Sequence, residues 1–232
     1  DWYLVLNSDA ALQPGFFRGI LAATKGAPDI GLVSPVLQDE EGVQQTSLFL
    51  FHSPMSEFIR GANSGPVTQR LKRFDISLDA SRQAPRAQWA SFACILLRGD
   101  MIRQIGPMDD GYFLYFEDAE YCLRAGRKGW RIAHAPQAVA IHIGGGSGDV
   151  PSLASARKRL PAYYYRARSR FLYQAYGWAG LLASNLMWTA GRGFARLRRL
   201  FGKSVNPAVA HESADIWIHF MTPLVPTKAP GK

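Results

Sequence analysis

The sequence has few cysteines, no long apolar run and no signal peptide at its start. Two cysteines, Cys94 and Cys122, are too few for a disulfide framework, and their spacing does not match a zinc site. We therefore expect both thiols to pack inside a protein of a reducing compartment. No apolar stretch reaches the roughly 18 to 20 residues that a membrane-spanning helix needs, so we expect no integral membrane segment.

Acidic residues are missing from one long part of the chain. Between Val150 and His211 there are eleven Lys or Arg and no Asp or Glu, although the formal charge of the whole chain is only +9. Aromatic residues are interleaved with these basic residues. The mixture is typical of helices on an anionic membrane surface, and it also suits nucleic acid. Because no nucleic-acid-binding motif is present, we favour the membrane.

Of the 232 residues, 47% are hydrophobic and 19% charged, which indicates a globular protein. Buried strand-like runs alternate with segments of helical spacing, which predicts an α/β fold. The predicted elements are a strand over 1–9, a helix over 14–25, a strand over 30–34, a turn between paired strands at 39–42, a strand over 89–97, a helix over 99–106 and short strands over 131–135 and 138–141. Residues 46–88 show no persistent period and are predicted to be an insertion or lid, with Arg60, Arg70, Lys72 and Arg73 as phosphate contacts or a solvated face.

The strongest local signal lies between Tyr112 and Arg131. A strand-like aromatic run, 112–116, leads into Glu117 and Asp118 at the start of a predicted helix that ends near Gly129. At a helix N-terminus the free N–H groups and the macrodipole favour ionised carboxylates, so both acids should be charged. The pair could be a simple helix cap. Its place at the abrupt end of an aromatic run favours a functional site instead.

This stretch resembles the Glu-Asp motif of family 2 glycosyltransferases, most of all their rhamnosyltransferase-like branch. That branch carries a pattern of the type Phe-x-Tyr-Phe-Glu-Asp-x-Asp-x-Cys-x-Arg, which Phe113 to Arg124 follow here, with Gly129-Trp130 after it. Glu120 departs from the pattern, because Asp is commoner there. The resemblance extends over about residues 2–176. It implies a GT-A-like fold, a mixed sheet flanked by helices, which here lacks the first strands that hold the nucleotide in the family.

Two further segments are candidates for binding a metal ion and the sugar donor. Asn7-Ser8-Asp9 follows the first strand at the edge where α/β sheets bind ligands, although it could be only an Asn/Asp turn. His142 precedes a glycine run that could close on a phosphate, although a lone His is often structural. The resemblance implies that Asp9 and His142 hold Mg²⁺ or Mn²⁺. It also implies donor-binding residues, which are Asn7, Gly144, Gly145 and Ser147.

The resemblance also suggests catalytic and acceptor-binding residues. In an inverting transfer, an acceptor hydroxyl attacks the anomeric carbon while the nucleoside diphosphate leaves, and Asp118 is the predicted base. Glu117 is predicted to orient the acceptor or the helix. Trp89, Phe92 and Tyr115 are the candidates for acceptor binding. Phe92 replaces a Gly that is usual in the family, so the identity of the acceptor cannot be inferred from family members. Both Trp89 and Phe92 could also simply pack in the core.

These observations predict the C-terminal part of a GT-A catalytic domain in residues 1–150, basic amphipathic helices in 151–205 and an irregular tail in 206–232. The predicted function is transfer of a sugar from a nucleoside-diphosphate sugar to a saccharide or lipid-linked saccharide. The family resemblance suggests rhamnose as the sugar. The expected setting is bacterial cell-surface polysaccharide synthesis, in the cytoplasm at the inner face of the membrane. No nucleic acid is expected as a partner. The alternative is a truncated, non-catalytic module that binds only acceptor and membrane, and the coding sequence upstream of Asp1 would discriminate between the two.

Overall fold

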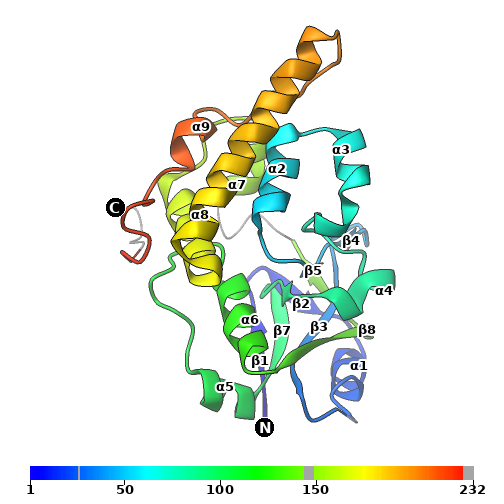
Figure 1. Cartoon of the computed structure of the whole chain (residues 1–232). Coiled ribbons are helices and arrows are strands. Elements are labelled where there is room, and N and C mark those ends of the chain that lie inside the picture. The colour runs from blue at the N-terminus through cyan, green and yellow to red at the C-terminus, as the bar shows by residue number, and fades with distance from the viewer. Residues whose placement is uncertain (26, 144–148, 227–232) are drawn as a thin grey trace. The chain divides into compact units, whose positions relative to one another are not determined.

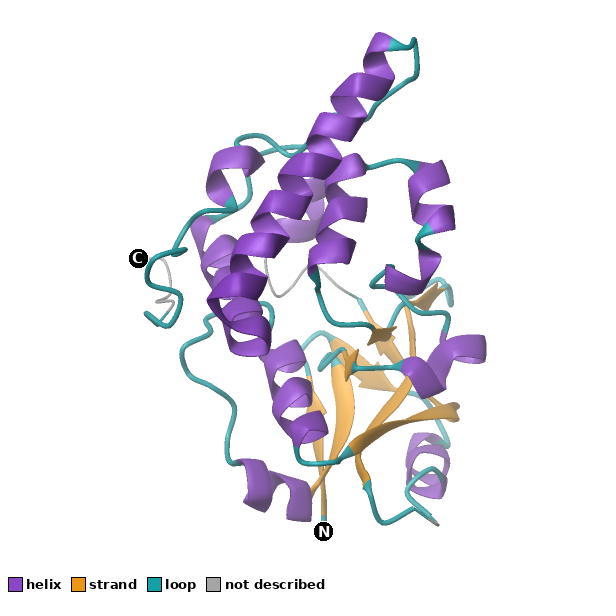
Figure 2. Ribbon diagram, viewed as in Figure 1, coloured by secondary structure: helices purple, strands orange, loops and turns teal. Residues whose placement is uncertain are grey.

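The computed structural model describes residues 1–25, 27–143 and 149–226, and its contacts divide the chain into two compact units (Figures 1 and 2). The sheet unit comprises residues 1–51, 77–109 and 118–147. The helical unit comprises residues 52–76, 110–117 and 148–232. The segment 46–88, predicted to be an insertion or lid, is divided between both units.

The sheet unit is built on one mixed sheet. Its main strands lie in the order β1-β7-β3-β8-β2, β4 pairs with β3, and β5 and β6 form a separate pair. The bounds are β1 (Trp2–Leu6), β2 (Ala10–Leu12), β3 (Ile30–Gln38), β4 (Gln44–Gln45), β5 (Leu48–Phe49), β6 (Trp89–Ala90), β7 (Cys94–Arg98) and β8 (Arg131–His142). Among the strands of the described residues, only β3 and β8 pair in parallel. Since β7 is antiparallel to both β1 and β3, the strands β1, β3 and β8 run in one direction and end at one edge.

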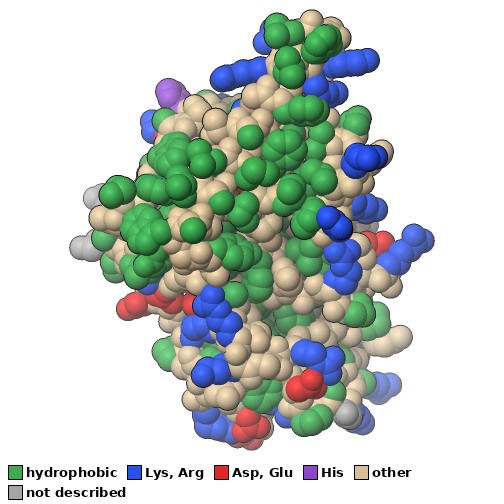
Figure 3. Space-filling model, in the orientation of Figure 1, with side chains coloured by type: hydrophobic (Ala, Val, Ile, Leu, Met, Phe, Trp, Pro, Cys, Tyr) green, Lys and Arg blue, Asp and Glu red, His purple; other side chains and the backbone are tan. Residues whose placement is uncertain are grey.

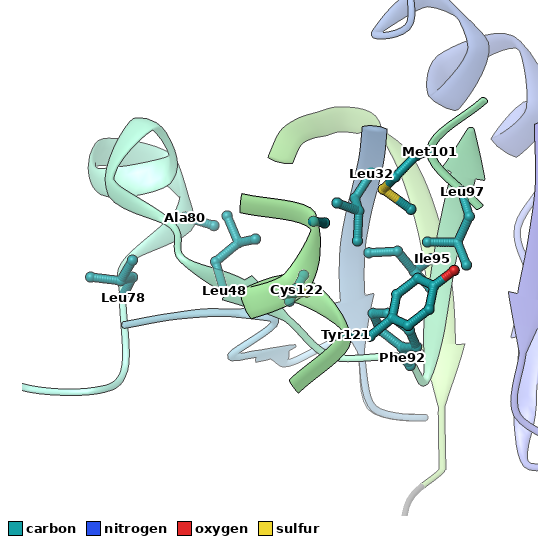
Figure 4. Packing of buried hydrophobic residues seen from close by; sticks show 12 residues of the cluster. Leu32, Leu48, Leu78, Ala80, Phe92, Ile95, Leu97, Met101, Tyr121 and Cys122 are labelled. Carbon is teal, nitrogen blue, oxygen red and sulfur yellow. The ribbon is translucent and has the colours of Figure 1, made fainter. Parts of the chain in front are cut away.

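Helices cover this sheet because its central strands are apolar on both faces. Helix α6 (Glu117–Arg127) places Tyr121, Cys122 and Ala125 in a core cluster with Leu32 and Ile95 (Figure 4). A second cluster packs helix α1 (Phe16–Ala22) against the sheet. The remaining helices of the unit are α4 (Ala80–Gln83), η2 (Ala84–Arg86) and α5 (Gly99–Ile105). The predicted α/β fold, a mixed sheet flanked by helices, is confirmed.

Several local predictions were wrong. The aromatic run 112–116 forms bends rather than a strand. The expected strand over 89–97 is two strands, β6 and β7, in different sheets. The two expected strands over 131–141 are one strand, β8, with an irregular register near its middle. An apolar sequence alone does not say where hydrogen bonding to a neighbouring strand stops.

The helical unit is organised around α8 (Ala162–Leu200), which is broken at Gly177 by non-helical backbone angles, φ 68° and ψ −169°. Helix α2 (Pro54–Ala62) packs along α8. The other helices are α3 (Gly65–Arg70), η1 (Lys72–Phe74), α7 (Val150–Ser155) and α9 (Glu212–Asp215). Among the described residues, no helix is both long and apolar enough to cross a membrane.

A buried ionic network joins α2, α8 and α9. Glu57 is fully buried and receives Arg168 at 2.8 Å and Arg60 at 2.6 Å, and Arg60 also pairs with Glu212. Burial alone would raise the pKa of Glu57, but the two guanidinium groups hold it well below its usual value. Arg60 and Arg168 are therefore structural cations. Helix α9, which contains Glu212, is ordered structure in a region predicted to be an irregular tail.

The network is possible because α2 and α8 approach each other closely at two glycines. A Cβ atom built on Gly61 would overlap the backbone oxygen of Trp188, and one built on Gly191 would overlap the backbone oxygen of Phe58. Gly193, two residues further along α8, would meet nothing within 4 Å. The close approach of the two helices thus requires glycine at positions 61 and 191, but not at position 193.

We predict that Gly61→Ala and Gly191→Ala each lower the free energy of unfolding by about 1 to 3 kcal/mol, because a close-packed contact must open. Gly193→Ala is the matched control and should raise it by about 0.5 to 1 kcal/mol, because alanine is the better helix former at an open position. Urea unfolding monitored by circular dichroism measures all three variants. Equal effects of Gly191→Ala and Gly193→Ala would contradict this account of the crossing.

Candidate active site

Strand pairing brings Asp9 and His142 together, although they are far apart in the sequence. Asp9 directly precedes β2, and Ala10 in β2 lies opposite His142 at the end of β8. The backbone oxygen of Asp9 also accepts a hydrogen bond from Ile143 N at 3.1 Å. In this arrangement His142 Nε2 lies 3.6 Å from Asp9 Oδ1. Two short elements therefore place a carboxylate and an imidazole at one edge of the sheet.

Gln45 on β4 orients the imidazole. Its Nε2 donates to the backbone oxygen of His142 at 2.9 Å, and its Oε1 lies 3.1 Å from His142 Nδ1. An amide oxygen can only accept, so Nδ1 carries the proton in this arrangement. The lone pair of Nε2 is then left facing Asp9. A hydrogen bond of this kind on the far ring nitrogen is what holds metal-binding histidines in one tautomer.

The Asp9 and His142 pair fits a divalent cation in ligand type. Both carboxylate oxygens of Asp9 are buried and accept no hydrogen bond within the described part of the chain. Unsatisfied buried carboxylate oxygens are costly, and a cation would satisfy them. In residues 1–25, 27–143 and 149–226, no group of three or more His, Cys, Asp or Glu side chains gathers as a metal cluster. The other ligands of such a cation would be phosphate oxygens and water, as hard cations prefer.

The residues predicted to bind the donor lie partly at this edge. Asn7 follows β1, donates its N–H to Ala93 O at 3.0 Å and accepts from Ala10 N at 3.1 Å, so it forms the turn that presents Asp9. Gly144, Gly145 and Ser147 lie outside the described residues. The donor role of all four stays a prediction.

Glu117 and Asp118 begin α6, as the sequence predicts. Asp118 Oδ1 accepts a hydrogen bond from Ala119 N at 2.8 Å. Burial raises the pKa of Glu117, which opposes the expected effect of the helix N-terminus on its charge. Its Oε2 is buried and receives no hydrogen bond from the described residues. The two neighbouring carboxyls thus have different environments, which is the usual way to separate the roles of two acids.

The start of α6 lies toward the same sheet edge as His142. Only Lys128 to Trp130 connect α6 to β8, so the helix and the strand run in opposite directions. The N-terminus of α6, with Asp118, therefore lies toward the carboxyl end of β8. The edge where β1, β3 and β8 end is where open α/β sheets bind ligands. Asp9, His142 and Asp118 all belong to the sheet unit and converge on this edge.

The loop before α6 has a strained backbone. Tyr115 and Phe116 both have positive φ, 69° and 68°, which bulky side chains rarely adopt. Within the helical unit, the Tyr115 ring lies 5.7 Å from Tyr164, and Phe116 lies 5.6 Å from Tyr164 and 5.7 Å from Phe171. This packing holds the strained turn, and strain of this kind gathers at functional sites.

The other two predicted acceptor residues have packing contacts. The Trp89 ring stacks on Phe49 at 4.1 Å, and its Nε1 donates to Leu50 O at 2.9 Å. Phe92 is 8% exposed and packs against Tyr121 with ring centroids 5.9 Å apart. These contacts account for both side chains as core residues. An acceptor role for Trp89, Phe92 and Tyr115 stays a prediction.

Sequence reasoning missed Gln45, which contacts His142. Gln45 lies in a two-residue strand, and nothing in its neighbours signals that it would meet His142. For the basic and aromatic segment that contains Tyr164, the sequence left two alternatives, which are the membrane surface and packing of residues 163–176 on the catalytic domain. Within the helical unit, Tyr164 packs on Tyr115 and Phe116.

The sequence was also compared with known proteins. It is 29% identical over 206 residues to an N-acetylglucosaminyl-diphospho-decaprenol L-rhamnosyltransferase of Mycobacterium tuberculosis, a match that covers 85% of this chain and 62% of that protein. It is 22% identical over 139 residues to a low-salt glycan biosynthesis hexosyltransferase of Haloferax volcanii, covering 60% of this chain and 41% of that protein. The chain thus spans less than two thirds of the length of these curated relatives.

The family comparison covers nearly the whole chain. The model described as "Glycosyl transferase family group 2" matches residues 2–224, which include both units and every described candidate residue of the site. The resemblance found in the Glu-Asp motif is therefore confirmed over the fold as a whole. The chain belongs to glycosyl transferase family group 2.

Proposed function

We propose that this chain belongs to a glycosyltransferase that moves a sugar from a nucleoside-diphosphate donor to a lipid-linked saccharide. The observation that carries the proposal is the pair Asp9 and His142, with unsatisfied carboxylate oxygens and an oriented imidazole. The acceptor class follows the M. tuberculosis relative, which is named for an N-acetylglucosaminyl-diphospho-decaprenol substrate. Rhamnose is the sugar that the same name suggests.

In this mechanism the candidate residues have separate roles. Asp118 accepts the proton of the attacking acceptor hydroxyl, and inversion follows from attack opposite the leaving diphosphate. Glu117, whose pKa burial raises, orients the acceptor by hydrogen bonding. Asp9 and His142 would hold Mg²⁺ or Mn²⁺, which supplies charge neutralisation for the departing diphosphate.

We predict that Asp118→Asn lowers transfer by about 10²- to 10⁴-fold, because the proton acceptor is lost while the side-chain shape is kept. Donor affinity should stay close to that of the unchanged protein. Released nucleoside diphosphate measures turnover, and calorimetry measures donor binding, with Asp110→Asn, an exposed acid in the preceding loop, as the control. Both assays use this chain and also the chain with any coding sequence in frame before Asp1. Equal loss of donor affinity and turnover would count against Asp118 as the base.

A non-catalytic module is the competing proposal. The chain spans 62% of the M. tuberculosis protein. Such a module would bind acceptor or membrane without binding a nucleotide sugar. If neither form of the chain binds any donor in the calorimeter with Mg²⁺ or Mn²⁺ present, the non-catalytic proposal replaces the proposal of an enzyme.

We predict that Gln45→Leu weakens metal-dependent binding of a nucleoside diphosphate about 10- to 100-fold, because His142 loses the partner that fixes its tautomer. Gln44→Leu is the matched control, since Gln44 is the exposed neighbour in the same strand. Titration with MnCl₂ followed by electron paramagnetic resonance gives the affinity. If the two variants titrate alike, Gln45 does not support a metal ligand.

We also propose that the helical unit binds an anionic membrane through the outer face of α8. Leu182, Leu186, Leu197 and Leu200 recur at helical spacing and are each at least 41% exposed. In Figure 3, hydrophobic side chains gather along α8, with basic side chains at its far end. Apolar insertion next to Arg and Lys is how such helices bind anionic lipid, at about 1 kcal/mol for each basic residue near the surface. Fewer than eleven basic residues take part, because Arg168 is buried.

We predict that Leu182→Gln with Leu186→Gln removes most binding to anionic vesicles, and that added salt weakens what remains. Phe17→Gln is the control, since Phe17 is 55% exposed but lies in the sheet unit. Point variants are needed because truncation after Tyr176 would also remove the buried Trp188. Co-sedimentation with neutral and anionic vesicles measures binding. Equal binding to both vesicle types would refute the membrane proposal.

A further inference from the structure

The helical unit contains an apolar pocket of about 490 Å³. Its walls are Tyr173 and Trp178 of α8 and the consecutive residues Thr222 to Pro226. None of these side chains is charged, and only Tyr173, Trp178 and Thr222 carry a polar group. A sugar or nucleotide site needs convergent polar groups to orient its ligand. The chemistry of this pocket fits a hydrocarbon chain.

The break in α8 shapes one side of the pocket. Gly177 adopts φ 68° and ψ −169°, and this turns Trp178 out of the regular helix. The Trp178 ring then lies 5.2 Å from Tyr173 and 5.4 Å from Phe220, edge to face in both cases. Because Trp178 is fixed between two rings, the pocket wall is already formed without a ligand.

Two side chains of α8 fix the opposite wall. Ser169 Oγ donates to Ile218 O at 2.7 Å, and Arg170 Nη1 donates to Leu224 O at 2.6 Å. These bonds hold the segment after α9 along one face of the helix. The same face continues to Gln174, whose Oε1 accepts from Tyr112 Oη at 2.5 Å. The pocket therefore lies on the helix segment that also holds the loop leading to Glu117.

A buried arginine and a buried histidine lie on the segments that form the apolar walls. Arg166 Nε and His219 Nδ1 are buried, and neither makes a hydrogen bond within the described residues. Burial, and then the charge of Arg166, lower the pKa of His219, which favours its neutral form. His219 is tied to the pocket wall because its backbone oxygen accepts from Thr222 N at 3.2 Å. Arg166 lies two helical turns before Tyr173 on the same face of α8.

We propose that the pocket and the Arg166–His219 pair bind the phosphate-linked isoprenoid chain of a lipid carrier. The buried N–H groups would bind the phosphate, and the apolar walls would take the hydrocarbon next to it. One pocket beside one cationic site suits a lipid with a single chain per phosphate, whereas a bilayer phospholipid carries two. That this lipid is the acceptor rests on the proposed function, but the binding site itself does not.

The test uses farnesyl diphosphate as the probe and measures its binding to the 232-residue chain by isothermal titration calorimetry, with no donor present. Val225→Trp should lower its affinity at least tenfold by filling the pocket, while Val43→Trp, the same change at an exposed turn of the sheet unit, should not alter it. Arg166→Gln should lower affinity for farnesyl diphosphate about tenfold, the scale of one charge-assisted hydrogen bond, and leave binding of farnesol unchanged. Thermal melts by circular dichroism check that each variant is folded.

Three results would overturn the inference. One is no binding of farnesyl diphosphate, and another is equal loss of affinity in Val225→Trp and Val43→Trp. The third is equal or tighter binding of dihexanoyl phosphatidylglycerol, which would identify bilayer lipid as the occupant. Because no donor or turnover enters the assay, a failure of the transferase proposal does not affect it. A transferase that works on carrier-free acceptors but binds no farnesyl diphosphate would refute the lipid site alone.

Discussion

The position of β8 between β3 and β2 is the constraint on which the candidate site depends. Its parallel pairing with β3 directs its carboxyl end to the edge where β1 also ends. Its antiparallel pairing with β2 then sets Ala10 opposite His142, which leaves Asp9 beside the imidazole. Gln45 can reach His142 only because β4 pairs with the end of β3. Strand β8 thus positions the two metal candidates, and the pairing of β4 with β3 positions the residue that orients His142.

The helical unit depends on a different kind of contact. The buried carboxylate of Glu57 requires the cations that surround it, and these come from α2 itself and from α8. A buried charge that loses one partner is strongly destabilised, so the two helices are held in one arrangement. That arrangement leaves one face of α8 exposed and apolar and directs another face toward the 112–117 loop and the segment after α9. The proposed surface binding, the proposed lipid pocket and the packing of the 112–117 loop thus all involve a single helix.

The sequence predicted the fold class and the family because those signals are local or motif-based. Alternating apolar runs indicate buried strands and helices, and Phe113 to Arg124 carry a spacing that is specific to the family. It did not predict the positive φ angles of Tyr115 and Phe116, because an aromatic run is equally typical of a strand. It did not predict the role of Gln45, and it could not distinguish the structural Arg168 from basic residues at the surface. These features depend on contacts between residues far apart in the chain, which no local period records.

The central claim is that His142 is a metal ligand held in one tautomer by Gln45. Nitrogen-15 NMR of the histidine side chains tests it directly. His134 of the same strand is the internal reference, since its Nδ1 lies 3.1 Å from a backbone oxygen, that of Ser34. We expect His142 to carry its proton on Nδ1. Substoichiometric Mn²⁺ with a nucleoside diphosphate should broaden the His142 Nε2 resonance and leave His134 sharp. A proton on Nε2 of His142, or equal broadening of both histidines, would contradict the account.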